Sequence, residues 1–213
     1  LLDSSLKPDP GKIKVKRNFI DDPGYGDPAA RQSFYLFIGR LSPEKGVSTL
    51  LDAWRQMPGE QIRIVGDGPE KQKLVGQYGH LPNVDFVGKK PREEVLALMK
   101  TCKALIFPSV WYEGLPLTII EAFATGTPVI GSALGAMQEM IGDAFNGLLF
   151  EPGDSNGLNE KVNQLNQYIS AKDFTLHENA RKSYLERYHP DQCYQDILGI
   201  YAELIKTKSS VRE

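Results

Sequence analysis

The sequence predicts an α/β protein built on a doubly wound, Rossmann-like parallel sheet. From residue 33 onward, short apolar runs alternate with longer amphipathic segments, and the connections between them are short. Leu105–Phe107 and Val129–Ile130 are apolar without interruption, which is typical of strands buried on both faces. This alternation favours a parallel sheet with right-handed crossovers and helices on both sides.

The expected strands are short apolar runs bounded by polar or turn-forming residues. They are Phe34–Ile38, Gln61–Val65, Val84–Val87, Ala104–Phe107, Pro128–Gly131 and Gly147–Phe150. The expected helices are Val47–Gln56, Pro69–Tyr78, Arg92–Thr101, Leu117–Ala124, Met137–Ile141, Asn156–Ile169, Thr175–Arg187 and Asp191–Lys206. In the first helix Val47, Leu50, Leu51 and Trp54 share one face, and Pro69 suits the first turn of the second helix.

The chain divides into three predicted parts. Residues 1–31 are rich in Pro, Gly and Asp and are expected to be an interdomain linker, with one strand-like piece at Ile13–Lys16. Residues 32–188 form the Rossmann-like domain, and residues 189–213 form a C-terminal helix and tail. Because the chain begins with Leu1 rather than Met, we expect it to be a piece of a longer protein.

Composition excludes several classes of function. The formal net charge of -2 is unlike the basic excess of most nucleic-acid-binding proteins. Cys102 and Cys193 lie far apart and without metal-type spacing, so we expect two buried free thiols of a cytoplasmic protein. The three histidines are also far apart, no signal peptide is visible, and no apolar run approaches the length of a membrane span.

The loop after the first strand carries two cations. In such folds ligands bind at the carboxyl ends of the strands, and this loop runs from Gly39 to Gly46. Gly39 allows a ligand to approach the backbone, while Arg40 and Lys45 offer a fork of donors and a point charge to phosphate oxygens. A solvated turn in which the cations pair with Glu44 or water explains the pattern equally well.

The loop after the second strand resembles part of a dinucleotide fingerprint. It contains Gly66 and Gly68, but Lys71 stands where the third glycine of Gly-x-Gly-x-x-Gly would be. A tight turn from strand to helix is the favoured interpretation, and Gly66 can still form one wall of a site.

The loop after Phe107 leads into a predicted helix that begins near Pro116. The unpaired N–H groups and the dipole of a helix start favour anions, and Gly114 allows close approach. Glu113 precedes this helix and Glu121 lies in its second turn, so a diphosphate there has a carboxylate on either side for sugar or ribose hydroxyls. Otherwise Glu113 only complements the dipole and Glu121 is merely exposed, although its apolar neighbours argue for a buried carboxylate that needs a partner.

A fourth loop, Gly131–Glu139, is rich in small residues and follows the strand Pro128–Gly131. Close packing of backbone is the favoured explanation, and ligand binding is the alternative.

Several segments together resemble one family. They are Gly39-Arg40 with Lys45-Gly46, the strand end Asn83–Gly88, Glu113 and Glu121 separated by seven residues, and Gly126–Val129. In order and spacing they are similar to glycosyltransferase family 4, whose members are retaining transferases with the GT-B fold. The resemblance covers roughly residues 18 to 201, and it implies that residues 32–188 bind a nucleotide sugar.

The resemblance also implies a role for each matching residue. Arg40 and Lys45 would hold the donor diphosphate, Glu113 would contact hydroxyls of the transferred sugar, and Glu121 would bind the ribose. The backbone N–H groups around the segment Gly114, Leu115, Pro116 and Leu117 would meet the sugar and phosphate. Gly66, Val87 and Gly88 would frame the base, and Gly39 would also contact the donor. No metal or other cofactor is expected, and the sequence contains no Asp-x-Asp.

A GT-B enzyme has two Rossmann-like halves, and this chain resembles only the C-terminal one. The other half would supply the glycan or lipid-linked acceptor site, so the chain alone is expected to bind donor and to transfer sugar poorly. Its last helix often braces the other half and is therefore expected to be undocked here. We expect the whole protein to be cytoplasmic, with peripheral contact to the cytoplasmic face of the membrane as an alternative.

UDP-glucose is the favoured donor and GDP-mannose the second choice. A dinucleotide-dependent oxidoreductase, a non-catalytic nucleotide-binding module and a sugar-nucleotide epimerase-like domain are the alternatives. The absence of the third glycine and the presence of the two glutamates argue against the oxidoreductase.

Overall fold

The computed structural model describes residues 13, 14, 16 and 18–209, and within them six parallel strands form one sheet. The strands are β1 (Phe34–Ile38), β2 (Gln61–Val65), β3 (Val84–Gly88), β4 (Leu105–Phe107), β5 (Val129–Ser132) and β6 (Gly147–Phe150). Their order in the sheet is β3-β2-β1-β4-β5-β6, and every neighbouring pair is parallel. The predicted doubly wound, Rossmann-like sheet is therefore confirmed.

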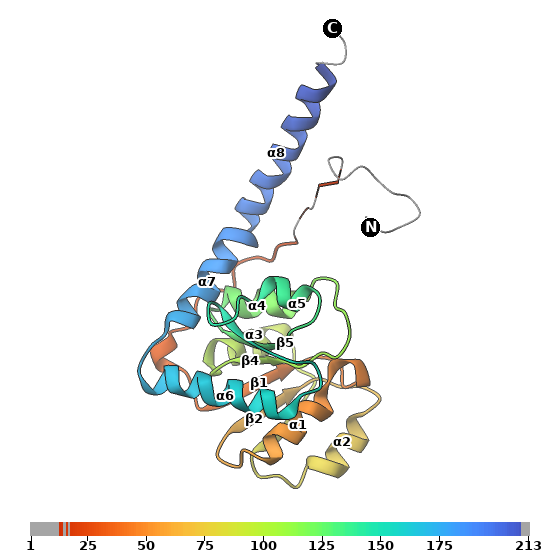
Figure 1. Cartoon of the computed structure of the whole chain (residues 1–213), viewed down its shortest axis with the longest axis vertical. Helices are drawn as coiled ribbons and strands as arrows, with labels where there is room; N and C mark the ends of the chain where they lie inside the picture. The colour runs from red at the N-terminus through yellow and green to blue at the C-terminus, as the bar shows by residue number, and fades with distance from the viewer. Residues whose placement is uncertain (1–12, 15, 17, 210–213) are drawn as a thin grey trace.

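Helices cover both faces of the sheet, as Figure 1 shows. They are α1 (Val47–Arg55), α2 (Lys71–Tyr78), α3 (Arg92–Thr101), α4 (Leu117–Ala124), α5 (Ala136–Met140), α6 (Ser155–Ser170), α7 (Thr175–Arg187) and α8 (Pro190–Ser209). One core cluster joins the sheet to α1, α2 and α6, and the other joins it to α3, α4, α5 and α7. Because both faces are buried, the strands need the continuous apolar runs seen in the sequence.

Most predicted elements begin and end within one residue of the observed ones, but two predictions fail. The helix predicted from Pro69 begins at Lys71. Residues 69 and 70 form a turn in which the Lys71 N–H donates to the Gly68 carbonyl at 3.1 Å, and the Glu70 N–H donates to the Leu41 carbonyl at 2.9 Å. Of the predicted strand Ile13–Lys16, the described residues 13, 14 and 16 are not in a strand, and residue 15 lies outside the described part of the chain. Short 3₁₀ helices at Pro28–Ala30 and Pro43–Lys45 were not predicted.

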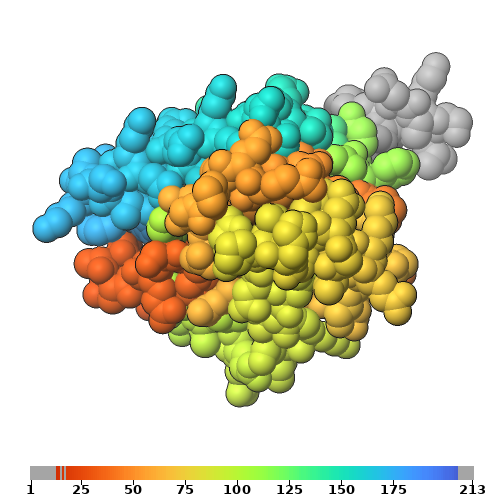
Figure 2. Space-filling view, turned by 90° about the horizontal axis from the view of Figure 1, so that it is seen from below, coloured from red at the N-terminus to blue at the C-terminus, as the bar shows by residue number. Residues whose placement is uncertain are grey.

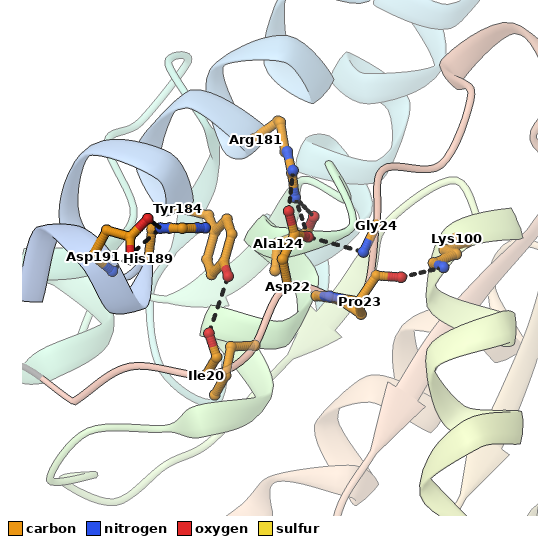
Figure 3. A network of polar contacts seen from close by, with 10 residues as sticks. All are labelled: Ile20, Asp22, Pro23, Gly24, Lys100, Ala124, Arg181, Tyr184, His189 and Asp191. Atoms are coloured by element: carbon orange, nitrogen blue, oxygen red, sulfur yellow. Dashed lines mark hydrogen bonds and ion pairs between the residues drawn. The ribbon is translucent and has the colours of Figure 1, made fainter.

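The segment before β1 is bound to the domain by a polar network (Figure 3). The Arg181 guanidinium of α7 donates to both carboxylate oxygens of Asp22, at 2.8 and 2.6 Å, and also to the Ala124 carbonyl. The Tyr184 hydroxyl donates to the Ile20 carbonyl at 3.0 Å. In Figure 2 the red segment accordingly lies beside the blue α7.

Arg31 joins the same segment to the ends of two helices. Its guanidinium donates to the Met99 and Cys102 carbonyls at the end of α3, and to the Thr125 and Gly126 carbonyls just after α4, at 2.8–3.0 Å. These carbonyls carry the negative ends of the two helix dipoles, which offset the buried charge of Arg31. Residues 20–31, which the sequence suggested as linker, thus pack on the domain; the division of the chain at residues 31 and 188 stays a prediction.

The last helix extends away from the body of the molecule (Figure 1). Its exposed large apolar side chains are Tyr194, Leu198, Tyr201, Leu204 and Ile205. Among the helix residues whose side chains the structure describes, Cys193 of the first turn is buried, and Glu203 forms an ion pair with Lys14 at 2.6 Å. That this helix braces another half of the protein stays a prediction. Among the described residues no helix is both long and apolar enough to cross a membrane.

Candidate functional site

The order of the strands places a switch point between β1 and β4. From β1 the chain winds outward through β2 and β3, and it then returns to β4 on the other side of β1. The loops that leave β1 and β4 at this point diverge to opposite faces, which opens a crevice at the carboxyl ends of the two strands. A cavity of about 180 Å³ occupies this crevice. It is lined by Phe37, Ile38, Gly39, Arg40, Lys45, Phe107, Pro108, Ser109, Glu113, Pro116 and Thr118.

An ion pair links the two loops that border this cavity. Lys45 Nζ lies 2.6 Å from Glu113 Oε1, and the two side chains are only 26% and 19% exposed. Gly46, with φ of 64°, brings the loops together, because a Cβ there would lie 1.9 Å from the Pro108 carbonyl oxygen. Only glycine fits both that backbone conformation and that approach. The first loop therefore holds its lysine against a carboxylate that is 68 residues away in sequence.

Further hydrogen bonds fix the two loops to each other. The Val110 N–H donates to the Glu44 carbonyl at 3.0 Å. The Ser109 hydroxyl, almost fully buried, lies 2.9 Å from Glu113 Oε1. The Glu44 carboxylate accepts from the Ser42 hydroxyl at 2.5 Å, and this bond lowers the pKa of Glu44. Lys45 pairs with Glu113, and among the described residues no ion pair joins Lys45 to Glu44, so the alternative that Glu44 neutralises Lys45 is not the arrangement observed.

Arg40 lies between this cavity and a second, more open hollow. The second hollow, of about 490 Å³, runs over the ends of β1, β2 and β3. It is lined by Ile38, Gly39, Arg40, Val65, Gly66, Asp67, Gly68, Lys89, Lys90 and Val95. In the described part of the chain the Arg40 guanidinium has no hydrogen bond or ion pair, so its donors are available to a ligand. The two hollows have Ile38, Gly39 and Arg40 in common.

Only glycine fits at position 66, because the backbone packs closely at this edge of the sheet. A Cβ at Gly66 would lie 1.8 Å from the Gly39 carbonyl oxygen, so a side chain there is excluded whether or not a ligand binds. At Gly114, by contrast, a Cβ would meet no atom within 4 Å. The start of α4 is therefore open beside Glu113. Within the described residues, the N–H groups of Gly114, Leu115 and Leu117 have no backbone partner.

Glu121 is not part of the cavity around Lys45. Its carboxylate pairs with Arg92 of α3, with 3.1 Å between Arg92 Nε and Glu121 Oε1, and only 17% of the Glu121 side chain is exposed. The expectation that this carboxylate needs a partner is thus met by a residue that the sequence analysis did not name. Neither hollow is lined by Val87, Gly88, Gly114, Leu115, Leu117 or Glu121.

The sequence analysis also gave no role to Ser109, Thr118, Lys89 or Lys90. Ser109 follows β4 by two residues and the two lysines follow β3 directly, so position after a strand end was the signal available for them. Over the described residues, no group of three or more His, Cys, Asp or Glu side chains is placed to hold a metal ion.

Residues 26–183 match the family model for glycosyl transferases group 1. The chain belongs to this family. The resemblance given by the Arg40, Lys45, Glu113 and Glu121 motifs is confirmed, and the Rossmann-like unit is one half of a GT-B fold.

Individual glycosyltransferases match over most of this chain and about half of their own length. An uncharacterized glycosyltransferase of Methanocaldococcus jannaschii is 31% identical over 174 residues, which are 81% of this chain and 48% of the relative. The O-antigen chain mannosyltransferase C of Escherichia coli is 31% identical over 186 residues, 83% of this chain and 48% of the relative. The crystal structure of Anabaena HepE in complex with UDP and glucose superposes with a TM-score of 0.74 and 26% identity. That match covers 89% of this chain and 56% of HepE.

Proposed function

We propose that this chain is the donor-binding half of a retaining glycosyltransferase that transfers a hexose from a UDP-sugar, UDP-glucose first, to a glycan or polysaccharide acceptor. The observation that carries the proposal is the meeting of Arg40, Lys45 and Glu113 around one cavity at the switch point of the sheet. Two cations and one carboxylate there match a ligand with a diphosphate at one end and sugar hydroxyls at the other.

Each residue has a chemical role in this proposal. Arg40 and Lys45 bind the diphosphate and stabilise the negative charge that develops on the leaving nucleotide, so no metal is needed for that task. Glu113 accepts hydrogen bonds from the sugar, and the open N–H groups at the start of α4 meet the sugar and phosphate. Glu121 accepts from the ribose, and Arg92 is the ion-pair partner of this carboxylate in the structure without donor.

The proposed donor is UDP-glucose because the similar HepE was crystallised with UDP and glucose and also with UDP-glucose. GDP-mannose is the second candidate, since the similar Escherichia coli protein is named a mannosyltransferase. The chain spans about half the length of the curated relatives it matches. The acceptor, which we propose to be a glycan or a lipid-linked glycan, then binds mainly to the other half, and this chain alone binds donor without efficient transfer.

Calorimetric titration with UDP-glucose, GDP-mannose and NAD tests the proposal. UDP-glucose is expected to bind most tightly, and equal binding with and without EDTA is expected if the cations alone neutralise the diphosphate. Tighter binding of GDP-mannose would make GDP-mannose the donor and would leave the proposed glycosyltransferase function in place. Binding of NAD without binding of either sugar nucleotide would overturn it.

A further inference from the structure

Ser109 has one proton to donate and three oxygens within reach. Its Oγ lies 2.9 Å from Glu113 Oε1, 3.0 Å from the Glu44 carbonyl oxygen and 3.3 Å from the Trp111 carbonyl oxygen. The Glu44 carbonyl already accepts the Val110 N–H, and the Trp111 carbonyl is the most distant of the three. The carboxylate is nearest and charged, and charge-assisted hydrogen bonds are the stronger ones. The proton of Ser109 therefore goes to Glu113.

Ser109 and Lys45 both hold the same oxygen of Glu113. Each donates to Oε1, at 2.9 and 2.6 Å. Across the residues that the structure describes, Oε2 of Glu113 accepts no hydrogen bond. One oxygen of the carboxylate is thus fixed to the protein and the other is free to accept from a sugar hydroxyl.

The two partners of Glu113 differ in how easily they move. Lys45 carries its charge on a long side chain with several rotatable bonds, and a diphosphate in the cavity competes with Glu113 for that charge. Ser109 has a single rotatable bond to its hydroxyl oxygen and is about 1% exposed, so it cannot follow a ligand. When Lys45 turns toward a diphosphate, Ser109 is the contact that remains on Oε1.

We propose that Ser109 is a positioning residue that keeps Glu113 aimed at the transferred sugar while Lys45 is engaged by the diphosphate. This inference rests on the proposed donor-binding function and assigns a task within it. It requires that Ser109 matters for the part of the donor that Glu113 contacts, the sugar, and not for the nucleotide diphosphate. UDP and UDP-glucose differ in that part.

Titrations of Ser109→Ala with UDP and UDP-glucose test the role. We expect UDP-glucose affinity to fall about tenfold, equivalent to about 1.4 kcal/mol, with UDP affinity within about twofold of the unsubstituted chain. Ser183→Ala is the matched control, because Ser183 is a buried serine on α7 whose hydroxyl donates to the Asn179 carbonyl at 2.8 Å, and no residue of α7 lines either hollow. It is expected to leave both affinities unchanged. In the background of Glu113→Gln, Ser109→Ala should cost less than threefold in UDP-glucose affinity.

The outcomes separate the inference from the proposed function. If the unsubstituted chain binds both ligands and Ser109→Ala binds UDP-glucose equally well, the role of Ser109 is wrong and the proposed function stands. If Ser109→Ala weakens UDP and UDP-glucose equally, Ser109 acts on the loop as a whole and the sugar-specific role is again wrong. If the unsubstituted chain binds neither ligand, the proposed function is overturned together with the inference. Thermal melting of each variant identifies a folding defect. If Ser109→Ala is defective, Ser109→Thr, which keeps the hydroxyl, is titrated in its place. It is expected to bind UDP and UDP-glucose with the same ratio of affinities as the unsubstituted chain.

Discussion

Replacing Lys45 by alanine tests the proposed diphosphate contact most directly. The ammonium group lies at the cavity between β1 and β4 and its side chain is 26% exposed, so its bond to a phosphate oxygen is partly shielded from water. Charge-assisted hydrogen bonds contribute about 1.5–3 kcal/mol. Because the site is partly open, we take about 2 kcal/mol, which weakens UDP binding roughly thirtyfold.

The substitution also changes what the diphosphate meets. Without Lys45, the Glu113 carboxylate keeps only its bond to Ser109 and faces the phosphates with its charge less compensated. Repulsion between like charges should therefore add to the loss of affinity. In a Glu113→Gln background the same Lys45→Ala substitution should cost less, and calorimetric titration of all four proteins with UDP measures the difference.

A distant lysine supplies the control for this experiment. Lys182 on α7 is 59% exposed and its ion pair with Glu186 is 3.9 Å long, so Lys182→Ala removes one positive charge away from the site. It should change UDP affinity by less than about twofold at moderate salt, because exposed charges are screened over about 10 Å. A Lys45→Ala protein that binds UDP within twofold of the unsubstituted chain would refute the diphosphate role.

Three further predictions concern one donor contact and two sources of stability. Glu121→Gln should weaken UDP but not inorganic pyrophosphate in calorimetry, and equal losses would exclude ribose recognition. Arg181 lowers the pKa of Asp22 to about 2, so the pair stabilises the fold above about pH 4 and this stabilisation is lost as pH falls toward 2. Asp22→Asn should therefore cost about 1 kcal/mol near neutral pH after allowance for exposure, and less in acid, by thermal melting. Burial and the charge of Arg31 lower the pKa of His177 to about 4, so the stability that neutral His177 contributes above pH 6.5 is lost as pH falls toward 4. In His177→Phe the free energy of unfolding, measured with urea, should therefore fall by up to about 3 kcal/mol less over this pH range.

Local patterns in the sequence were sufficient for most elements. The apolar spacing that makes one face of α1 or both faces of β4 is a property of a few neighbouring residues, and those elements were found within a residue of their limits. The start of α2 was predicted two residues early, since Pro69 and Glu70 form a turn, and the sequence did not show that the Glu70 N–H donates to the Leu41 carbonyl, 29 residues away and on another loop. A contact of that kind between two loops is not encoded in the few residues around Pro69 and Glu70.

The candidate site shows the same division. Position after a strand end was enough to select Arg40, Lys45 and Glu113, because parallel strands bring all their carboxyl ends to one edge. It was not enough to predict that Arg92 would pair with Glu121, or that Ser109 would bond to the same carboxylate oxygen as Lys45. Those contacts depend on side-chain directions between separate elements, which no single segment encodes.

The sequence by itself determined the alternation of strands and helices and the family, and it suggested the edge of the sheet at which we propose that the donor binds. The tertiary structure decided which loops meet there: β4 pairs with β1 rather than with the preceding strand β3, and this places Glu113 beside Lys45. The physical reason is that apolar periodicity and turn chemistry act over a few residues. The order of strands and the pairing of charges depend instead on how the whole chain packs around its two cores.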